Sequence, residues 1–416
     1  MATAACLAAD DAAFMVKTQL SGCPNDDWHD HVMSLPSTLK LTTEAGAVLV
    51  NVGANKGYQA VEHLSRFAPQ HNLSARSWHA AIREYAKAGT GRTDGRPHGY
   101  LLAMGSCGAC GDCANVAPSR FGRRGLPRRS THVHLLELAP ANRALLRSLG
   151  RRFGLSDVVT VHDLAASNES HVARAPRHIM AGFEVESLCG GSTKGNCDPR
   201  LAESVRTTTI DDFATSFDLR RVYHLKIDVE GWDALVVEGS RQLLSARRVH
   251  LLEFEYSGHG MWGGGGGGHA PWLTHGQRSL FVVMRELWRY GYMCFMQGRC
   301  DLLGPVNGPC WHQRFETHKW SNVLCSADAM VIRLLQNRTN WSAASRQAGL
   351  WRVWRHYHAA SCEWVRPPPG QCVQISENHG MAWVAPVEVR GKYNNRSKSS
   401  CAGTQQRSPT SKVNRI

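Results

Sequence analysis

The sequence lacks several features that would assign it to a common class of protein. None of its apolar runs approaches 18 residues, so no transmembrane helix is expected in this chain of 416 residues. The opening MATAACLAADDAAFMVK contains Asp10 and Asp11, where a secretory signal peptide has an unbroken apolar region. The dinucleotide fingerprint G-x-G-x-x-G is also absent, which counts against an NAD-dependent enzyme. With 43% hydrophobic and 20% charged residues, the composition is that of a globular protein with a sizeable core.

The positive charge of the chain is confined to two segments. The net charge is +14, yet residues 336–416 carry 12 Lys and Arg against 3 Asp and Glu, and residues 83–130 carry 9 against 3. The remainder is therefore nearly neutral. A basic tail is typical of a solvated, poorly ordered end, so no specific nucleic-acid partner is expected.

Fourteen cysteines and five N-x-S/T sequons leave the compartment open. The sequons lie at Asn72, Asn168, Asn337, Asn340 and Asn395. Disulfides and glycosylation would both fit the lumen of the secretory pathway, whereas the missing signal peptide favours the cytoplasm. Loops closed by Cys189–Cys197 or Cys362–Cys372 disulfides are one reading of the cysteine spacing.

A second cysteine pattern has the spacing of a metal site. Cys107, Cys110 and Cys113 form C-x2-C-x2-C, which suits structural zinc or an iron–sulfur cluster. His98, His132 and Cys189 are candidates for a fourth ligand. Disulfides with other cysteines, or free thiols, are the alternatives.

Apolar runs alternate with helical patterns along the chain. Strands are predicted at 47–52, 132–138, 158–162, 222–229 and 249–256, and helices around 61–68, 142–149 and 232–244. This alternation predicts an α/β fold with a parallel sheet covered on both faces. A helix at 279–290 and two strands, in GYMCFM and DAMVIRLL, are predicted after a glycine run at 263–268, which is read as a mobile loop. Disorder is expected from about residue 390.

Ligands of such sheets bind at the carboxyl ends of the strands. The first strand ends in a turn framed by Gly53 and Gly57, beside Asn51 and Asn55. Glu137 ends the second strand, where a carboxylate either accepts hydrogen bonds from ribose hydroxyls or caps the next element. Asp163 follows the third strand, as a contact to a base edge or as a helix cap.

The segment LKIDVEGWDAL carries charges along one strand face. Lys226, Asp228 and Glu230 lie two residues apart in sequence, so an extended backbone places them on the same face. An internal Lys226–Asp228 salt bridge that merely ends the strand is the alternative. Glu253 and Glu255 repeat this spacing in LLEFEY. Such carboxylates can hold a cationic cofactor or take a proton from a substrate hydroxyl.

The motifs NVGANKG, LELAP, TTTIDDF, KIDVEGWDALVVEG and LLEFE together resemble the FkbM family of S-adenosylmethionine-dependent methyltransferases. The resemblance covers roughly residues 45–335, including GYMCFMQGRCDLL and the SNVLC segment as closing strands. It implies a Rossmann-like sheet of seven strands, mostly parallel with the last strand antiparallel. It further implies that Gly53, Asn55 and Gly57 line the amino-acid end of S-adenosylmethionine and that Glu137 holds its ribose. Asp228 and Glu230 would lie near the methyl group and the substrate.

Two departures from the family pattern bear on this assignment. Asn51 stands where the family turn opens with Asp, which loses a charge that would attract the cofactor's ammonium. About 80 residues separate the glycine turn from Glu137, so a cysteine-rich, basic insert is predicted at about 75–130. We therefore expect an extension at 1–44, a methyltransferase domain at 45–335 and a basic extension at 336–416.

The expected activity is methyl transfer from S-adenosylmethionine to a hydroxyl of a sugar or other small metabolite. Asn51, Gly53, Asn55, Gly57, Glu137, Asp163 and Asp228 are the candidate cofactor-binding residues. Asp228, Glu230 and Glu253 are the candidate catalytic residues, with His259 as a further candidate base. The alternatives are an inactive Rossmann-like binding module for a polyanion or protein partner, and a nucleotide- or NAD-dependent oxidoreductase. The oligomeric state is not readable from the sequence.

Overall fold

The structure is a computed structural model of the whole chain. It describes residues 27–88, 130–176, 188–189, 202–257, 260–262, 278–297, 303–317 and 320–338, and five short strands between residues 356 and 400. The chain divides into two compact units, one built mainly from Leu20–Thr339 and the other mainly from Asn340–Ile416. No helix among the described residues combines the length and the apolar character needed to cross a bilayer.

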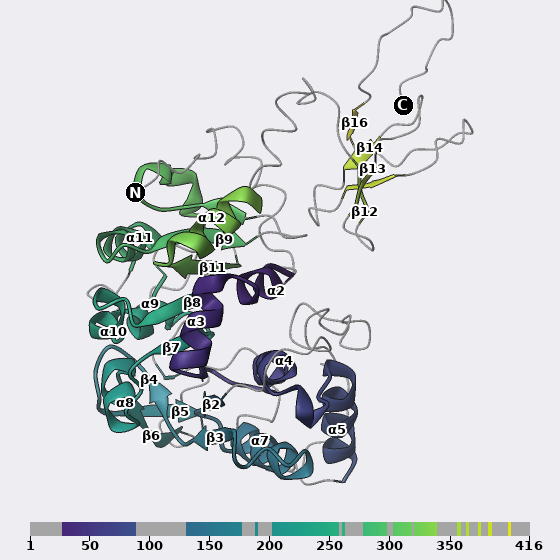
Figure 1. The fold of residues 1–416 in the computed structure, drawn as a ribbon, viewed down its shortest axis with the longest axis vertical. Coiled ribbons are helices and arrows are strands. Elements are labelled where there is room, and N and C mark those ends of the chain that lie inside the picture. Colours follow the sequence, from purple (N-terminus) through teal and green to yellow (C-terminus); the bar gives the residue numbers. More distant parts are fainter. Residues whose placement is uncertain are drawn as a thin grey trace, which may run out of the picture. The chain divides into compact units, whose positions relative to one another are not determined.

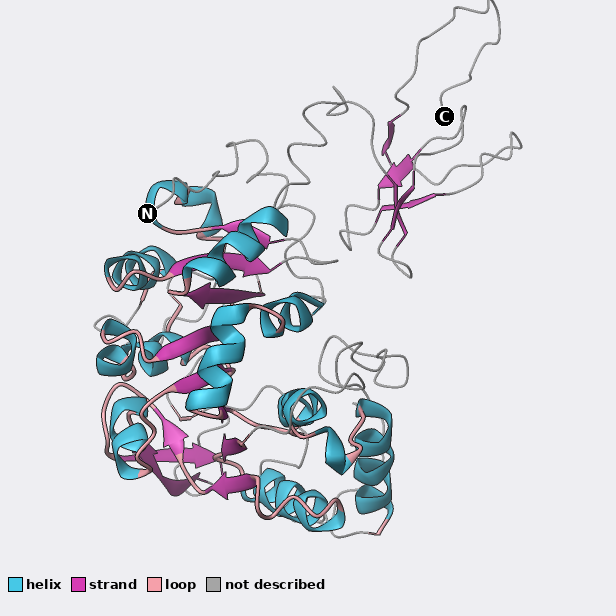
Figure 2. Ribbon diagram, viewed as in Figure 1, coloured by secondary structure: helices cyan, strands magenta, loops and turns pink. Residues whose placement is uncertain are grey.

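The first unit is built on one large sheet, visible as the central layer in Figures 1 and 2. Its strands run in the order β10-β9-β11-β8-β7-β1-β2-β3. The bounds are β1 Ala47–Val52, β2 Thr131–Leu136, β3 Val159–His162, β7 Val222–Ile227, β8 Val249–Tyr256, β9 Met293–Gln297, β10 Leu303–Pro305 and β11 Ser321–Ser326. The five strands from β3 to β8 are parallel, and β11 runs antiparallel to both β8 and β9.

The expectation of seven strands is wrong, because the sheet has eight. The eighth strand, β10, pairs antiparallel with β9 at the edge. It is only three residues long and includes Gly304 and Pro305, so it carries none of the apolar alternation by which a strand is recognised in sequence.

Helices cover both faces of the large sheet. On one face lie α8 Ile210–Ser216, α9 Asp233–Glu238, α10 Arg241–Ser245 and α11 Leu280–Arg289. On the other lie α2 Asp27–Met33, α3 Pro36–Glu44, α4 Tyr58–Phe67, α5 Ala75–Lys87, α7 Pro140–Arg152 and α12 Ala329–Arg338. A small second sheet has the order β4-β6-β5, with β4 Ala165–Ala166, β5 Val172–Pro176 and β6 Ala202–Thr208. Single 3-10 turns occur at η1 Pro69–His71, η3 Gly308–Cys310 and η4 Gln313–Phe315.

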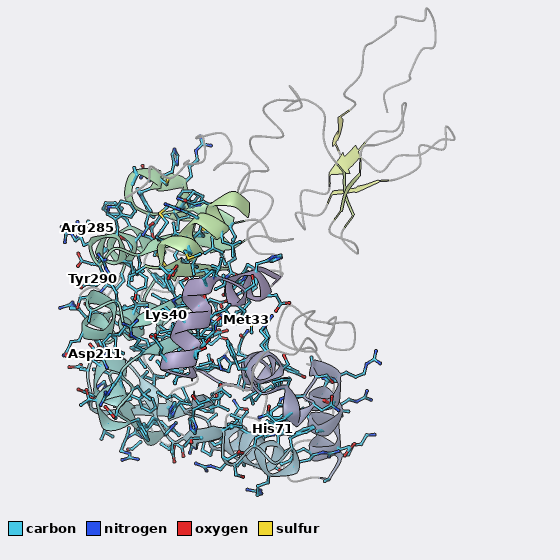
Figure 3. All side chains as sticks on the ribbon, viewed as in Figure 1. Met33, Lys40, His71, Asp211, Arg285 and Tyr290 are labelled. Carbon is cyan, nitrogen blue, oxygen red and sulfur yellow. A yellow bond between two sulfur atoms is a disulfide. The ribbon has the colours of Figure 1, made fainter. Side chains whose placement is uncertain are left out.

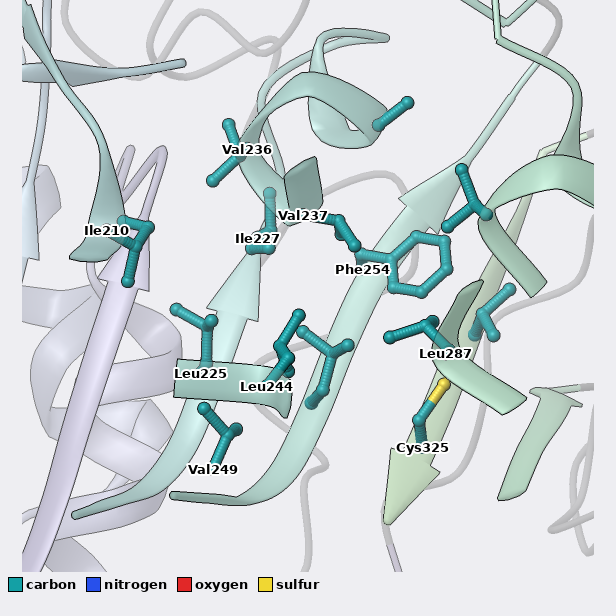
Figure 4. Packing of buried hydrophobic residues seen from close by; sticks show 14 of the residues in the cluster. Ile210, Leu225, Ile227, Val236, Val237, Leu244, Val249, Phe254, Leu287 and Cys325 are labelled. Carbon is teal, nitrogen blue, oxygen red and sulfur yellow. The ribbon is translucent and has the colours of Figure 1, made fainter. Parts of the chain in front are cut away.

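The largest apolar core lies between the sheet and helices α8 to α11 (Figure 4). Leu225, Ile227 and Phe254 are fully buried there, against Val236 of α9 and Leu244 of α10. Alternate residues of the same strands point to the opposite face. That alternation directs the polar side chains of β7 and β8 toward the face of the sheet opposite helices α8 to α11.

Several predicted elements need correction. DAMVIRLL was predicted as a strand, but it forms α12, and the closing strand is β11 in SNVLCS. The Asp328 carboxylate accepts hydrogen bonds from the backbone N–H groups of Met330 (2.8 Å) and Val331 (3.0 Å), which caps the start of a helix. Val331 and Leu335, four residues apart, then pack into the core. The single helix predicted over 232–244 is two helices, α9 and α10, separated at Gly239.

The predicted insert at 75–130 begins with a helix of the domain core. Trp78, Ala81 and Ile82 of α5 are buried against α4 and α7. The structure does not describe residues 89–129, which include the cysteine cluster, or the glycine run at 263–268. The predicted metal site and the predicted mobile loop therefore stay predictions.

The second unit contains short strands of three residues each. β12 His356–His358 pairs with β13 Glu363–Val365, and β14 Val373–Ile375 lies between β15 Ala382–Val384 and β16 Lys398–Ser400. All these pairings are antiparallel. The predicted disorder from about residue 390 falls almost wholly on residues outside the described ones and stays a prediction.

Candidate functional site

Three bends at the carboxyl ends of the parallel strands converge on one pocket. Its walls come from the ends of β1, β2 and β7 and from the small sheet. The lining residues are Val52, Gly53, Leu136, Leu138, Leu164, Ala165, Ala166, Leu188, Val229 and Trp232. The pocket has room for about 20 Å³, enough for a single water molecule. A nucleoside therefore needs its apolar walls to move apart.

The glycine turn after β1 packs closely on the chain that leaves β7. Gly53 has φ +78°, and a Cβ there would lie 1.8 Å from the backbone oxygen of Asp228. The Asp228 N–H donates to the Val52 carbonyl oxygen at 2.9 Å. Gly53 thus permits a close approach of two backbone segments at the wall of the pocket. At Gly57, φ +78°, a Cβ would meet the side chain of Leu146.

Glu137 connects the bends after β1 and β2. Its Oε2 accepts from the backbone N–H of Asn55 at 2.7 Å, and its Oε1 accepts from the N–H of Ala139 at 2.8 Å. Asn55 has φ +45°, in the left-handed region that Asn tolerates. Burial raises the pKa of Glu137, while the hydrogen bonds from Ala139 and Asn55 oppose that rise. The carboxylate therefore already has a capping role, and the Asn142 side chain donates a third hydrogen bond to it. About one of its four acceptor positions is left for a ligand.

Asp163 lies beyond β3 and forms an ion pair with α7. Its Oδ1 is 2.8 Å from Nη1 of Arg143, and 57% of its side chain is exposed. The guanidinium is largely buried and also donates to the backbone carbonyl oxygen of Leu138, which anchors the Asp163 carboxylate beside this bend. Asp163 would have to give up or share this partner to contact a base edge.

Lys226 and Glu253 form a buried pair across β7 and β8. Lys226 lies opposite Glu253 in register, and its Nζ is 3.2 Å from Oε1 of Glu253. His224 Nε2 is 3.3 Å from the other oxygen, Oε2. Burial alone would raise the pKa of Glu253, but Lys226 and His224 lower it to about 2. Both oxygens of this candidate base are therefore engaged, and it stays ionised at neutral pH.

Asp228 and Glu230, just beyond β7, form an acidic cluster with Glu255, near the end of β8. One carboxylate oxygen from each lies within 4.8 Å of the others. Burial and the neighbouring Asp228 raise the pKa of Glu255 well above its usual value. The same two causes raise the pKa of Asp233 to about 7. Close, partly uncompensated carboxylates of this kind favour a positive charge placed among them.

The loop of the acidic cluster has an unusual backbone. Glu230 has φ +54° and Gly231 has φ +90°. Asp233 holds the loop, because its carboxylate accepts from the N–H groups of Gly231 and Glu255, each at 3.2 Å. From the sequence, Glu255 was given the same possible roles as Glu253 but was not placed among the catalytic candidates, and Asp233 was not named. The signal for Asp233 was a third acidic residue directly after the EGW turn.

The structure thus brings most of the predicted site residues to one edge of the sheet. Gly53, Asn55 and Glu137 lie at one bend, and Asp228 and Glu230 at the next. The Asn51 side chain is buried one strand away from Lys226, opposite it in register. The cysteines proposed for a metal and His259 lie outside the described residues. Cys189 is bonded in a disulfide, so it is not the fourth ligand.

Comparison with family models finds a match to part of the chain. Residues 122–294 match the family described as the Methyltransferase FkbM domain, which confirms the resemblance over this range and favours neither alternative function. The glycine turn precedes the matched range. A search of curated proteins found no match.

Among solved structures, the FkbM methyltransferase from Methylobacillus flagellatus matches with 13% identity and a TM-score of 0.30. The match covers 76% of this chain, and the chain spans 58% of that protein. At this level of similarity it carries no argument about the site.

Proposed function

We propose that this chain, whose residues 122–294 match the Methyltransferase FkbM domain family, transfers a methyl group from S-adenosylmethionine to a hydroxyl of a sugar or other small metabolite. The observation that carries the proposal is the convergence of three strand-end bends on one apolar pocket beside an acidic cluster. An apolar wall suits a purine ring. Carboxylates at two neighbouring bends suit ribose hydroxyls and a cationic group.

The residues present fit this nucleoside in kind. Leu138 and Leu164 would face the base, and Glu137 would accept from a ribose hydroxyl with its remaining lone pair. Asn55 and the turn from Gly53 to Gly57 would contact the amino-acid end. When bound, the sulfonium supplies an electrophilic methyl group that needs no metal for its transfer.

The acidic cluster would orient the acceptor and remove its proton. A hydrogen bond joins the carboxyl groups of Asp228 and Glu255, and the pKa of Glu255 is raised. A positive charge placed beside Glu255 would lower its raised pKa and so yield a carboxylate that can accept the hydroxyl proton. We assign this role to Asp228, Glu230 and Glu255, and assign Glu253 to holding Lys226 in place. Most of the rate enhancement would come from aligning the acceptor oxygen with the methyl group.

Calorimetric titration with S-adenosylhomocysteine tests the proposal. Micromolar binding to the wild-type chain is expected. S-adenosylmethionine carries the sulfonium charge that S-adenosylhomocysteine lacks, so D228N should weaken its binding about tenfold, the loss of roughly 1.4 kcal/mol in one charge contact. D218N is the matched control, since Asp218 lies in an exposed turn with φ +47°, which Asn also adopts. Binding of NAD without S-adenosylhomocysteine would point to an oxidoreductase. Salt-sensitive binding of nucleic acid alone would point to an inactive binding module.

A further inference from the structure

An exposed sequon lies on the described surface far from the proposed site. Asn72 follows η1, with Leu73 and Ser74 completing the N-x-S pattern. Its side chain is exposed, and within the described part of the chain its carboxamide makes no hydrogen bond. Figure 3 labels the preceding residue, His71, on the connection between α4 and α5.

The backbone around Asn72 presents this carboxamide to solvent. Asn72 has φ 49° and ψ 40°, a left-handed conformation that turns the chain sharply after η1. Leu73 is buried beneath it, which fixes the connection to the core. Ser74 is extended and begins α5 as its N-cap. A bulky group on Asn72 therefore projects outward without displacing a helix.

The connection lies at the edge of the sheet opposite the pocket. Helix α4 starts at the carboxyl end of β1 and runs back along it, and His63 Nε2 lies 3.0 Å from the carbonyl oxygen of Ala47, the first residue of β1. The segment that follows α4 is thus beside the amino ends of the strands. A glycan there would leave the candidate site accessible.

An independent observation concerns the oxidation state of the chain. All four cysteines among the described residues, namely Cys189, Cys294, Cys310 and Cys325, are in disulfides. Cys294 of β9 lies directly opposite Cys325 of β11, and both are fully buried. Stable disulfides of this kind form and persist in oxidising compartments, which in eukaryotic cells is also where N-x-S asparagines receive glycans.

We propose that Asn72 carries an N-linked glycan, acquired in the oxidising lumen where the cysteines pair. In this modification Nδ2 of Asn72 forms a bond to the anomeric carbon of an oligosaccharide. The bond from that carbon to the diphosphate of a polyprenyl carrier breaks, the carrier leaves as its diphosphate, and the amide nitrogen loses one proton. The proposal is independent of the methyl acceptor and of cofactor binding.

The test uses the full chain and two variants produced in the cells of the source organism. Peptide N-glycosidase treatment in H2(18)O, followed by mass spectrometry, should convert Asn72 to 18O-labelled Asp in the wild type. N72Q should lack one glycan mass relative to the wild type. S74T is the matched control, because Thr keeps both the sequon and a capping hydroxyl, so it should remain glycosylated.

A second measurement probes the cysteines in the same samples. Alkylation without reduction should leave Cys294 and Cys325 unlabelled in the denatured protein. A wild-type peptide with entirely unmodified Asn72 overturns the proposal, whatever the state of the cysteines. Loss of the glycan in S74T would also overturn it, because the sequon would then not be what specifies the modification.

Discussion

Replacing Glu137 separates its role in folding from its role in binding. Its two oxygens accept from the backbone N–H groups of Asn55 and Ala139, at 2.7 and 2.8 Å, in a fully buried setting. In E137A both N–H groups lose their partner. A buried donor left unpaired costs about 1–3 kcal/mol. The free energy of unfolding should therefore fall by roughly 2–6 kcal/mol.

E137Q is the milder change and the more informative one. Gln keeps one acceptor oxygen, so only one of the two N–H groups loses its partner, and the unfolding free energy should fall by about 1–3 kcal/mol. If Glu137 also holds the ribose, the dissociation constant for S-adenosylhomocysteine should rise about 5- to 150-fold, because a hydroxyl pair loses its charged acceptor.

Urea unfolding and calorimetry on the same preparations give the two quantities. E84Q is the matched control, since Glu84 is an exposed carboxylate paired with Arg152 on the surface, and we expect neither quantity to change. An E137Q protein that is less stable yet binds S-adenosylhomocysteine as tightly as the wild type would refute the ribose assignment. It would leave Glu137 as a cap between two bends.

Three further changes test the structure around the site. G53A should destabilise the protein by at least about 1–3 kcal/mol from backbone strain, with a further loss because its Cβ would collide with Asp228; unchanged urea unfolding would show that the two bends are not in contact. K226M should cost about 3–5 kcal/mol by leaving the buried Glu253 carboxylate without its cation, with only His224 beside it. K226M/E253Q should recover much of this loss, and equal stability of the single and double variants would contradict the ion pair. Because the pKa of Asp233 is raised to about 7, the folded protein keeps a proton that the unfolded chain releases near pH 4, so stability from this group should fall as the pH rises from about 4 to 7. D233N should remove that part of the pH dependence, and an unaltered profile would exclude Asp233 as its source.

The sheet could be predicted from sequence where apolar runs were long and ended in clear turns. β1 and β8 have the predicted bounds. β1 is apolar except for Asn51, β8 alternates apolar and polar residues in its second half, and each ends at a glycine or a polar turn. DAMVIRLL could not be assigned in this way, since eight residues with few polar ones fit a strand or one face of a helix. The Asp328 cap decides in favour of the helix.

The positions of the site residues could be predicted from the sequence, but the ion pairs among them could not. Asp228, Glu230 and Glu137 were predicted because they lie at the predicted ends of strands, and the carboxyl ends of parallel strands share one edge of the sheet. Whether Lys226 pairs with Asp228 or with Glu253 depends on the register between β7 and β8, which a single sequence does not contain. The contributions of Leu164 and Leu188 to the pocket likewise depend on how the small sheet packs.

A crystal structure with S-adenosylhomocysteine tests the central claim most directly. The account predicts the nucleoside between Leu138 and Leu164 in a widened pocket, its ribose hydroxyls within hydrogen-bond distance of Glu137 and its amino-acid end at Gly53. Density for the ligand at any other place, with this pocket still closed, would contradict the account.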